Sequence, residues 1–210
     1  MASTVLGGRP RPFAGAVLAG GRSRRMGRDK ATLSFAGETL LERQIRNLQE
    51  AGAGEILVSL NRERPQAAPH LRSARAVWDP AIPTDAGPII GLATVLTEAD
   101  ADLVAVVAVD LPRLRLCWWR NLRDLTSPGC GAVGRRSDGW FEPLAAIYPK
   151  GAVREVTARI RESTFALQPL IRAGLRQGWL RSWTIPPAWC SQLANWNQPV
   201  DVPENQLPNQ

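Results

Sequence analysis

Residues 13–30 read FAGAVLAGGRSRRMGRDK. The first six letters form an apolar run, which predicts a buried strand over residues 13–18. Gly20 and Gly21 follow directly, and without a Cβ their backbone N–H groups can approach a ligand closely. The basic side chains that come next suit the charge of a triphosphate, and they are Arg22, Arg24, Arg25, Arg28 and Lys30. The stretch therefore predicts a strand that leads into a phosphate-handling loop.

The spacing within this loop excludes two common nucleotide-binding motifs. The G-x-x-x-x-G-K-[ST] pattern of ATPases is missing, and so is the G-x-G-x-x-G pattern of dinucleotide-binding proteins. A solvated basic turn remains the alternative for a generic cluster of glycine and arginine. The motif by itself thus indicates phosphate binding without naming the ligand.

Beyond the loop, apolar runs typical of strands alternate with helical patterns, which is typical of a mostly parallel sheet covered by helices. A helix is expected after Thr39, with Glu42 at capping-box spacing and Gly52 in the left-handed position at its end. We predict the α/β class: a Rossmann-like, mostly parallel sheet flanked by helices, in a single domain. Further strands are expected over 55–60, 76–78, 103–109 and 143–148, further helices over 89–98, 153–162 and 165–177, and a glycine-rich turn over 129–139.

Polar residues stand at or just beyond the ends of three predicted strands, namely Asn61, Asp79 and Asp110. In open parallel sheets, ligands bind beyond the carboxyl ends of the strands. The three residues are therefore candidates for one site. Asp79 is followed directly by a proline, and Asp110 is followed by Leu-Pro. Because such sequences are common in turns, a turn-forming role is the alternative for each aspartate.

Composition limits the class of protein and its partners. The 210 residues carry 26 Lys and Arg against 19 Asp and Glu, a net charge of +7 that suits an anionic partner. Clustering of part of this charge in the glycine-rich loop favours a site over a nucleic-acid surface. Apolar runs stay well short of the about 20 residues of a membrane span, so no membrane partner is expected.

The sequence also indicates how the chain divides into segments and in which compartment the protein is expected. Residues 1–12 are expected to form a flexible leader, 13–201 the single folded domain and 202–210 a polar tail. The three cysteines are odd in number and lack metal-ligand spacing, which favours a reducing, cytoplasmic location. His70, the single histidine, is expected at the surface.

The loop Leu18-Ala19-Gly20-Gly21-x-Ser23-x-Arg25-Met26-Gly27-x-Asp29-Lys30 resembles the signature of nucleotidyltransferases related to the sugar-phosphate nucleotidylyltransferases. Within them the chain is similar to the molybdenum cofactor guanylyltransferase family. The similarity continues in the family's order to about residue 200. Its other segments are Asp79 with GPIIGL at 87–92, Asp110-Leu111-Pro112, FEPLAAIY at 141–148, and NWNQP at 195–199.

The resemblance implies transfer of GMP from GTP to the molybdenum cofactor with Mg²⁺, on the fold of nucleotide-diphospho-sugar transferases. It implies that Leu18, Ala19 and Gly20 line the guanine and ribose site. Lys30 would contact the triphosphate, and Arg25 would stabilise charge during transfer.

For the remaining site residues, the resemblance implies that Asp79 contacts the guanine nucleotide and that Asp110 holds Mg²⁺. Asn195 and Asn197 would lie near the second substrate and the metal. Many relatives carry Asn where this chain has Ser59, and Asn61 follows two residues later. Which of these two contacts the nucleotide is left open.

The resemblance also implies contacts with cofactor-delivering proteins and recipient molybdoenzymes, for which exposed members of the tryptophan-rich second half could form a docking surface. Alternatives of the same fold are cytidylyl transfer to the cofactor and nucleotidyl transfer to a sugar phosphate. Gly20-Gly21 favours guanine over cytosine, because cytidylyltransferase relatives tend to carry Ala-Gly. A non-catalytic nucleotide-binding relative is the alternative from another class.

Overall fold

The structure is a computed structural model that describes residues 13–20, 31, 33–35, 37–61, 71, 73–81 and 86–196. At its centre lies a seven-stranded sheet with the order β5-β4-β1-β6-β8-β7-β9. Strand β8 runs antiparallel to β6 and β7, while the other pairs in this sheet are parallel. The expected α/β class with a mostly parallel sheet is confirmed. The strands are β1 (Phe13–Leu18), β4 (Ala53–Asn61), β5 (Arg75–Asp79), β6 (Leu103–Ala108), β7 (Gly131–Arg135), β8 (Phe141–Pro149) and β9 (Leu180–Thr184).

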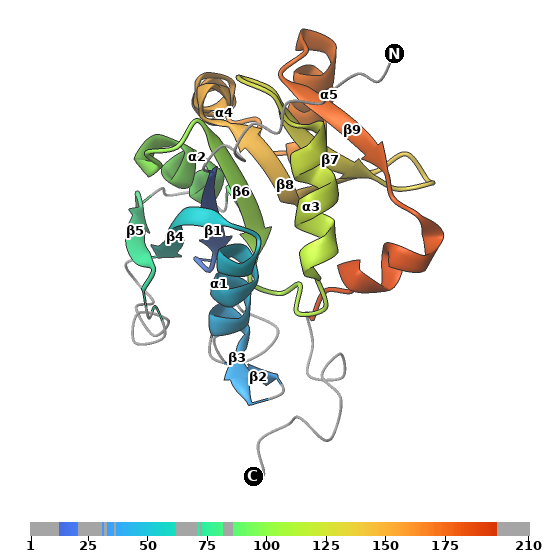
Figure 1. The fold of residues 1–210 in the computed structure, drawn as a ribbon. Helices are drawn as coiled ribbons and strands as arrows, with labels where there is room; N and C mark the ends of the chain where they lie inside the picture. Colours follow the sequence, from blue (N-terminus) through green and yellow to red (C-terminus); the bar gives the residue numbers. More distant parts are fainter. Residues whose placement is uncertain are drawn as a thin grey trace, which may run out of the picture.

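Helices cover both faces of the sheet (Figure 1). Helices α1 (Leu40–Glu50) and α3 (Leu116–Leu125) contribute to one buried cluster. The opposite cluster takes its helical side chains from α2 (Ile89–Glu98), α4 (Val153–Arg161) and α5 (Leu167–Gln177). Strand β6 supplies alternate residues to the two clusters, which explains why its sequence is continuously apolar rather than alternating.

Local signals at helix α1 are confirmed. The Thr39 hydroxyl accepts from the Glu42 N–H at 3.2 Å, and the Glu42 carboxylate accepts from the Thr39 N–H at 2.9 Å. Gly52 adopts a φ of +92° directly after the helix, a conformation that a residue with a Cβ rarely adopts. A short hairpin of β2 (Ser34–Phe35) and β3 (Glu38–Thr39) leads into the helix.

The expected glycine-rich turn over 129–139 is wrong in part, because β7 occupies 131–135. Gly131 and Gly134 are strand residues at close contacts rather than turn residues. A Cβ on Gly131 would lie 2.0 Å from the Ile147 carbonyl oxygen, and one on Gly134 would lie 2.8 Å from the Trp118 ring. Turns lie on both sides of this strand, at Gly129 with a φ of +69° and at Gly139 with a φ of +85°.

Elements that were not expected from the sequence are the strands β2, β3, β7 and β9, helix α3, and the 3₁₀ segments Lys150–Ala152 and Pro187–Leu193. The predicted helices and strands agree with the structure within about two residues at each end, which is the ordinary uncertainty of element boundaries. The leader at 1–12, the tail at 202–210 and His70 lie outside the described residues. Within the described part of the chain, no helix has the length and apolar character needed to cross a membrane.

Replacing Thr39 by Ala removes the side-chain half of the capping box. We expect a loss of about 1 kcal/mol in the free energy of unfolding, the usual effect of removing such a cap. Urea unfolding monitored by circular dichroism measures it. The control is Thr97→Ala on α2, where an exposed hydroxyl bonds only to the Ala93 carbonyl within the helix. Equal stability of Thr39→Ala and the unaltered protein would contradict the assigned cap.

Candidate functional site

The parallel strands bring several sequence-predicted site residues to one edge of the sheet. Strands β4, β1 and β6 lie side by side, and their register pairs Leu18 with Ser59 on one side and with Ala108 on the other. Strand β5 extends this edge, because Asn61 at the end of β4 pairs with Asp79 at the end of β5. Asp110 follows β6 by two residues. The carboxyl ends of these strands therefore lie at one edge of the sheet, and the role of the three polar residues as one site stays a prediction.

Asp79 is a largely buried carboxylate held by a neighbouring hydroxyl group. The Ser59 hydroxyl donates to it and lies 2.8 and 2.9 Å from its two oxygens. Burial raises the pKa of Asp79, and the hydrogen bond from Ser59 opposes this rise. Ser59 is itself buried and engaged with Asp79. Of the two residues left open by the sequence, Asn61 is the one that remains partly exposed.

Gly20 lies against this carboxylate, directly after Leu18 and Ala19. A Cβ on Gly20 would lie 2.7 Å from the Asp79 carboxylate and 3.3 Å from the Asn61 backbone nitrogen. Leu18 and Ala19 are buried, and the Ala19 N–H donates to the Ser59 carbonyl at 3.0 Å. These backbone contacts anchor the start of the glycine- and arginine-rich loop to β4. Residues 21–30, including Arg25 and Lys30, lie outside the described residues.

The loop after β6, residues 110–115, is held from two sides. Helix α1 binds its carbonyl oxygens through Arg43, Gln44 and Asn47. On the other side, the C-terminal segment contacts it through the Trp196 N–H, which donates to the Asp110 carbonyl at 3.0 Å. In the same segment, the Gln192 side chain accepts from the Arg115 N–H at 3.1 Å.

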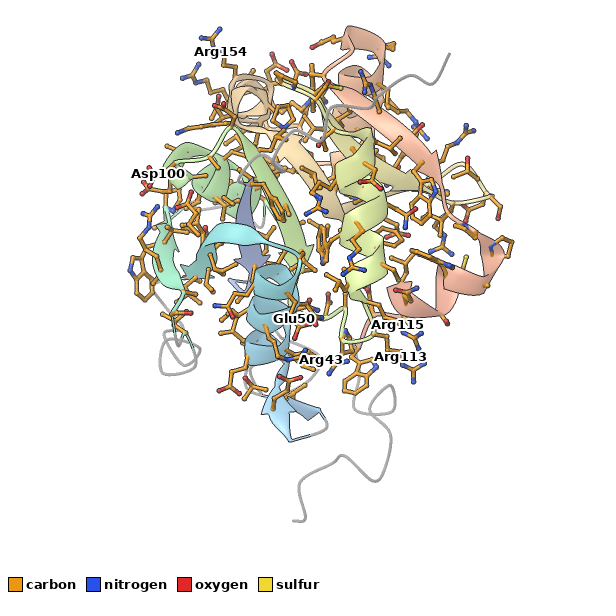
Figure 2. The ribbon with its side chains drawn as sticks, viewed as in Figure 1. Arg43, Glu50, Asp100, Arg113, Arg115 and Arg154 are labelled. Atoms are coloured by element: carbon orange, nitrogen blue, oxygen red, sulfur yellow. The ribbon has the colours of Figure 1, made fainter. Side chains whose placement is uncertain are left out.

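These contacts place Asn195 near Asp110. Asn195 is exposed and directly precedes the buried Trp196, whose backbone bonds to Asp110. The sequence separates the two residues by 85 positions, yet the fold joins their segments. Arg113 and Arg115 project from the same loop, at the end of the molecule where Arg43 lies on α1 (Figure 2). Asn197 lies outside the described residues.

Several polar residues around the site were missed in the sequence. They are Arg43, Gln44 and Asn47, which hold the loop after Asp110. A signal was available for Gln44 and Asn47. They alternate with Leu41, Ile45 and Leu48 along the buried stripe of α1, and an amide on such a stripe needs a hydrogen-bond partner.

The tryptophans divide between core and surface. Trp118, Trp119 and Trp196 are fully buried, which leaves them no part in docking. Trp140 is 55% exposed at the β7–β8 turn, and Trp78 is 37% exposed on β5. The possible docking surface in the second half is therefore limited mainly to the region of Trp140.

Residues 15–177 match the family model of the MobA-like NTP transferase domain. The chain belongs to this family. It is 42% identical to a protein from Opitutus terrae named "Probable molybdenum cofactor guanylyltransferase", and the match covers 90% of this chain and 92% of that protein. The family resemblance recognised in the sequence is confirmed.

Solved structures of relatives share the fold. Molybdopterin-guanine dinucleotide biosynthesis protein A from Archaeoglobus fulgidus has a TM-score of 0.69 at 21% identity, covering 90% of this chain and 94% of that one. A 2-C-methyl-D-erythritol 4-phosphate cytidylyltransferase from Thermus thermophilus has a TM-score of 0.63 at 19% identity, covering 90% and 95%. Since guanylyl and cytidylyl enzymes have similar scores, the fold alone does not choose the base.

Replacing Asp79 by Asn should change how stability depends on pH. The folded pKa of Asp79 is raised, so the folded state binds more protons than the unfolded state above about pH 4, and stability falls as the pH rises through this window. Asn cannot ionise, so the Asp79→Asn variant does not lose this stability as the pH rises. We expect its melting temperature to exceed that of the unaltered protein at pH 7, with a gap that narrows towards pH 4.5.

Thermal unfolding at both pH values measures this gap, and Ser59→Ala is the matched comparison. It removes a hydrogen bond that lowers the pKa of Asp79, so it should destabilise the protein more at pH 7 than at pH 4.5. Equal shifts at the two pH values for Asp79→Asn would refute the assigned burial cost.

Proposed function

We propose that this protein transfers GMP from GTP to the molybdenum cofactor, forming molybdopterin guanine dinucleotide and pyrophosphate. The observation that carries the proposal is the 42% identity to the Opitutus terrae relative over 90% of this chain. A phosphate oxygen of the cofactor attacks the α-phosphorus of GTP, and the bond to pyrophosphate breaks. Both reactants are anions, so the protein must supply positive charge and alignment more than acid–base groups. The net charge of +7 fits this need.

In this proposal Leu18, Ala19 and Gly20 border the guanine and ribose site, and Asp79 contacts the nucleotide. Support comes from the packing at Gly20, where any side chain would collide with the Asp79 carboxylate. A carboxylate with a raised pKa at a sheet edge is also a common feature of functional sites. Buried Ser59 supports Asp79, and Asn61 stands at the open end of β4.

We assign the charge-neutralising roles to Lys30, which contacts the triphosphate, and to Arg25, which stabilises charge during transfer. Both belong to the loop that starts at Gly20. Its start is anchored beside Asp79 by the Ala19 contact to β4. Arginine and lysine in a loop of this kind bind phosphate oxygens through charge-assisted hydrogen bonds.

Asp110 is the residue that would hold Mg²⁺ against the nucleotide phosphates. Asp110 is partly exposed at the sheet edge, and carboxylate oxygen is a ligand that Mg²⁺ prefers. Within the described residues, no group of three or more His, Cys, Asp and Glu side chains is placed to hold a metal. One carboxylate completed by phosphates and water suits Mg²⁺, which keeps several waters when bound. The metal would polarise the phosphates and neutralise their charge.

Asn195 and Asn197 face the second substrate in this proposal. The contact between Trp196 and Asp110 supports it, because it brings the segment of Asn195 to the proposed metal site. Amide groups can bind both a phosphate and the polar edges of a pterin. The molybdenum cofactor would then approach from the side of the C-terminal segment.

We also propose a cellular location and protein partners for the reaction. A cytoplasmic location fits the three free cysteines, Cys117, Cys130 and Cys190, because disulfides are rare in reducing compartments. Proteins that deliver the cofactor and molybdoenzymes that receive the product are the proposed partners. The exposed Trp140 is the described tryptophan best placed for such a contact.

The proposed activity is tested by pyrophosphate release from the purified protein with Mg²⁺ and molybdenum cofactor. GTP, CTP, ATP and UTP are compared in parallel. We expect release with GTP and at least tenfold less with the others, a discrimination of about 1.4 kcal/mol or more. Preference for CTP would make the protein a cytidylyltransferase. Binding of GTP without release in the presence of cofactor would favour a non-catalytic relative.

Asp110→Ala should reduce Mg²⁺-dependent turnover by a factor of about a hundred or more, because the charge that holds the metal is lost. The matched control is Asp124→Ala, which removes an exposed carboxylate on α3 and should keep full activity. Circular dichroism verifies that both variants fold. Full activity of Asp110→Ala would overturn the metal assignment.

A further inference from the structure

Helix α1 holds the loop that carries Asp110 by three side chains spaced along one face. Arg43 Nε donates to the Pro112 carbonyl at 2.6 Å. Gln44 Nε2 donates to the Leu111 carbonyl at 2.7 Å, and Asn47 Nδ2 donates to the Leu114 carbonyl at 3.1 Å. The carbonyls one, two and four positions beyond Asp110 are thus bound to the same helix.

Packing alone does not account for these side chains. Gln44 is completely buried, and its Oε1 atom has no hydrogen-bond partner among the residues that the structure describes. Burying an amide oxygen without a partner costs free energy, whereas an apolar side chain of similar volume would avoid that cost. Gln44 therefore does something other than fill space, and the contact it makes is the one to Leu111.

Arg43 also binds the β2–β3 hairpin, which directly precedes α1 in the chain. Its Nη1 donates to Glu38 Oε1 at 3.0 Å while its Nε binds the loop. Glu38 lies on β3, in the hairpin between the glycine- and arginine-rich loop and α1. Hydrogen bonding to Arg46 lowers the pKa of Glu38, and the bond to Arg43 acts in the same direction, so the carboxylate is charged. One guanidinium thus joins the hairpin to the Asp110 loop.

We infer that Arg43, Gln44 and Asn47 are positioning residues that fix where Asp110 presents its carboxylate. The inference rests on the proposed role of Asp110 as the metal ligand. With its neighbouring carbonyls bound to α1 and its own carbonyl bound to the Trp196 N–H, the Asp110 backbone has little freedom. A displacement of about 1 Å in a catalytic group can lower the rate by about a hundredfold.

Arg46 provides a matched control because, like Arg43, it binds Glu38, but unlike Arg43 it does not bind the loop after Asp110. It binds the same Glu38 carboxylate at 2.8 Å and also Glu50 at 2.9 Å. Its described bonds are to these two carboxylates, and none is to the loop after Asp110. Arg43→Gln and Arg46→Gln therefore remove the same charge from the same helix face, and only the first removes the bond to Pro112.

The test measures pyrophosphate release with GTP and cofactor as a function of Mg²⁺ concentration. For Arg43→Gln we expect the half-saturating Mg²⁺ concentration to rise at least fivefold and kcat to fall about tenfold, with the KM for GTP within twofold. Arg46→Gln should stay within twofold on all three quantities. A structural role alone would lower the amount of active protein without moving the half-saturating Mg²⁺ concentration.

Unchanged Mg²⁺ dependence of Arg43→Gln, or equal effects of the two arginine variants, would overturn the inference. Asn47→Ala, which removes only the bond to Leu114, should raise the half-saturating Mg²⁺ concentration as well. If Arg43→Gln does not fold, Asn47→Ala serves as the test in its place. An unchanged half-saturating Mg²⁺ concentration in Asn47→Ala would then overturn the inference. Full activity of Asp110→Ala is a separate outcome, which removes the proposed metal role itself.

Discussion

The site depends on the parallel alignment of β1 between β4 and β6. Backbone hydrogen bonds pair β1 with both neighbours in the same direction, so the carboxyl ends of all three strands reach one edge. Helices on both faces bury these strands, which makes a slip in register costly. The glycine- and arginine-rich loop, Asp79 and the Asp110 loop start from this edge. Loss of the parallel alignment would separate them.

Around this edge the protein retains buried polar groups that cost stability. Asp79 is a largely buried carboxylate with a raised pKa, and the buried Gln44 side-chain oxygen lacks a hydrogen-bond partner within the described part of the chain. Each group nevertheless makes a contact at the site: Asp79 lies against Gly20, and Gln44 binds the Asp110 loop. Such departures from an all-apolar core are expected where placement of a functional group outweighs stability.

The elements missed in the sequence lack local signals. Helix α3 begins after Arg115 without a side-chain cap and ends at Thr126 without a glycine, so neither end is marked. Gly131 and Gly134 suggested a turn, but their missing side chains serve close contacts with β8 and with Trp118. A glycine required by packing and a glycine required by a turn look the same in sequence. Only the neighbours across space distinguish them.

The sequence by itself determined the α/β class, the family to which the chain belongs, and most of the elements, namely β1, α1, β4, β5, α2, β6, β8, α4 and α5. These follow from periodicity, from caps such as Thr39 with Glu42, and from motifs, all of which are local along the chain. Only the tertiary structure decided which side chains support the site. Ser59 meets Asp79, α1 holds the loop after Asp110, and the Trp196 segment joins that loop. These contacts join residues 20 to 86 positions apart, and no local pattern encodes a hydrogen bond formed across such a distance.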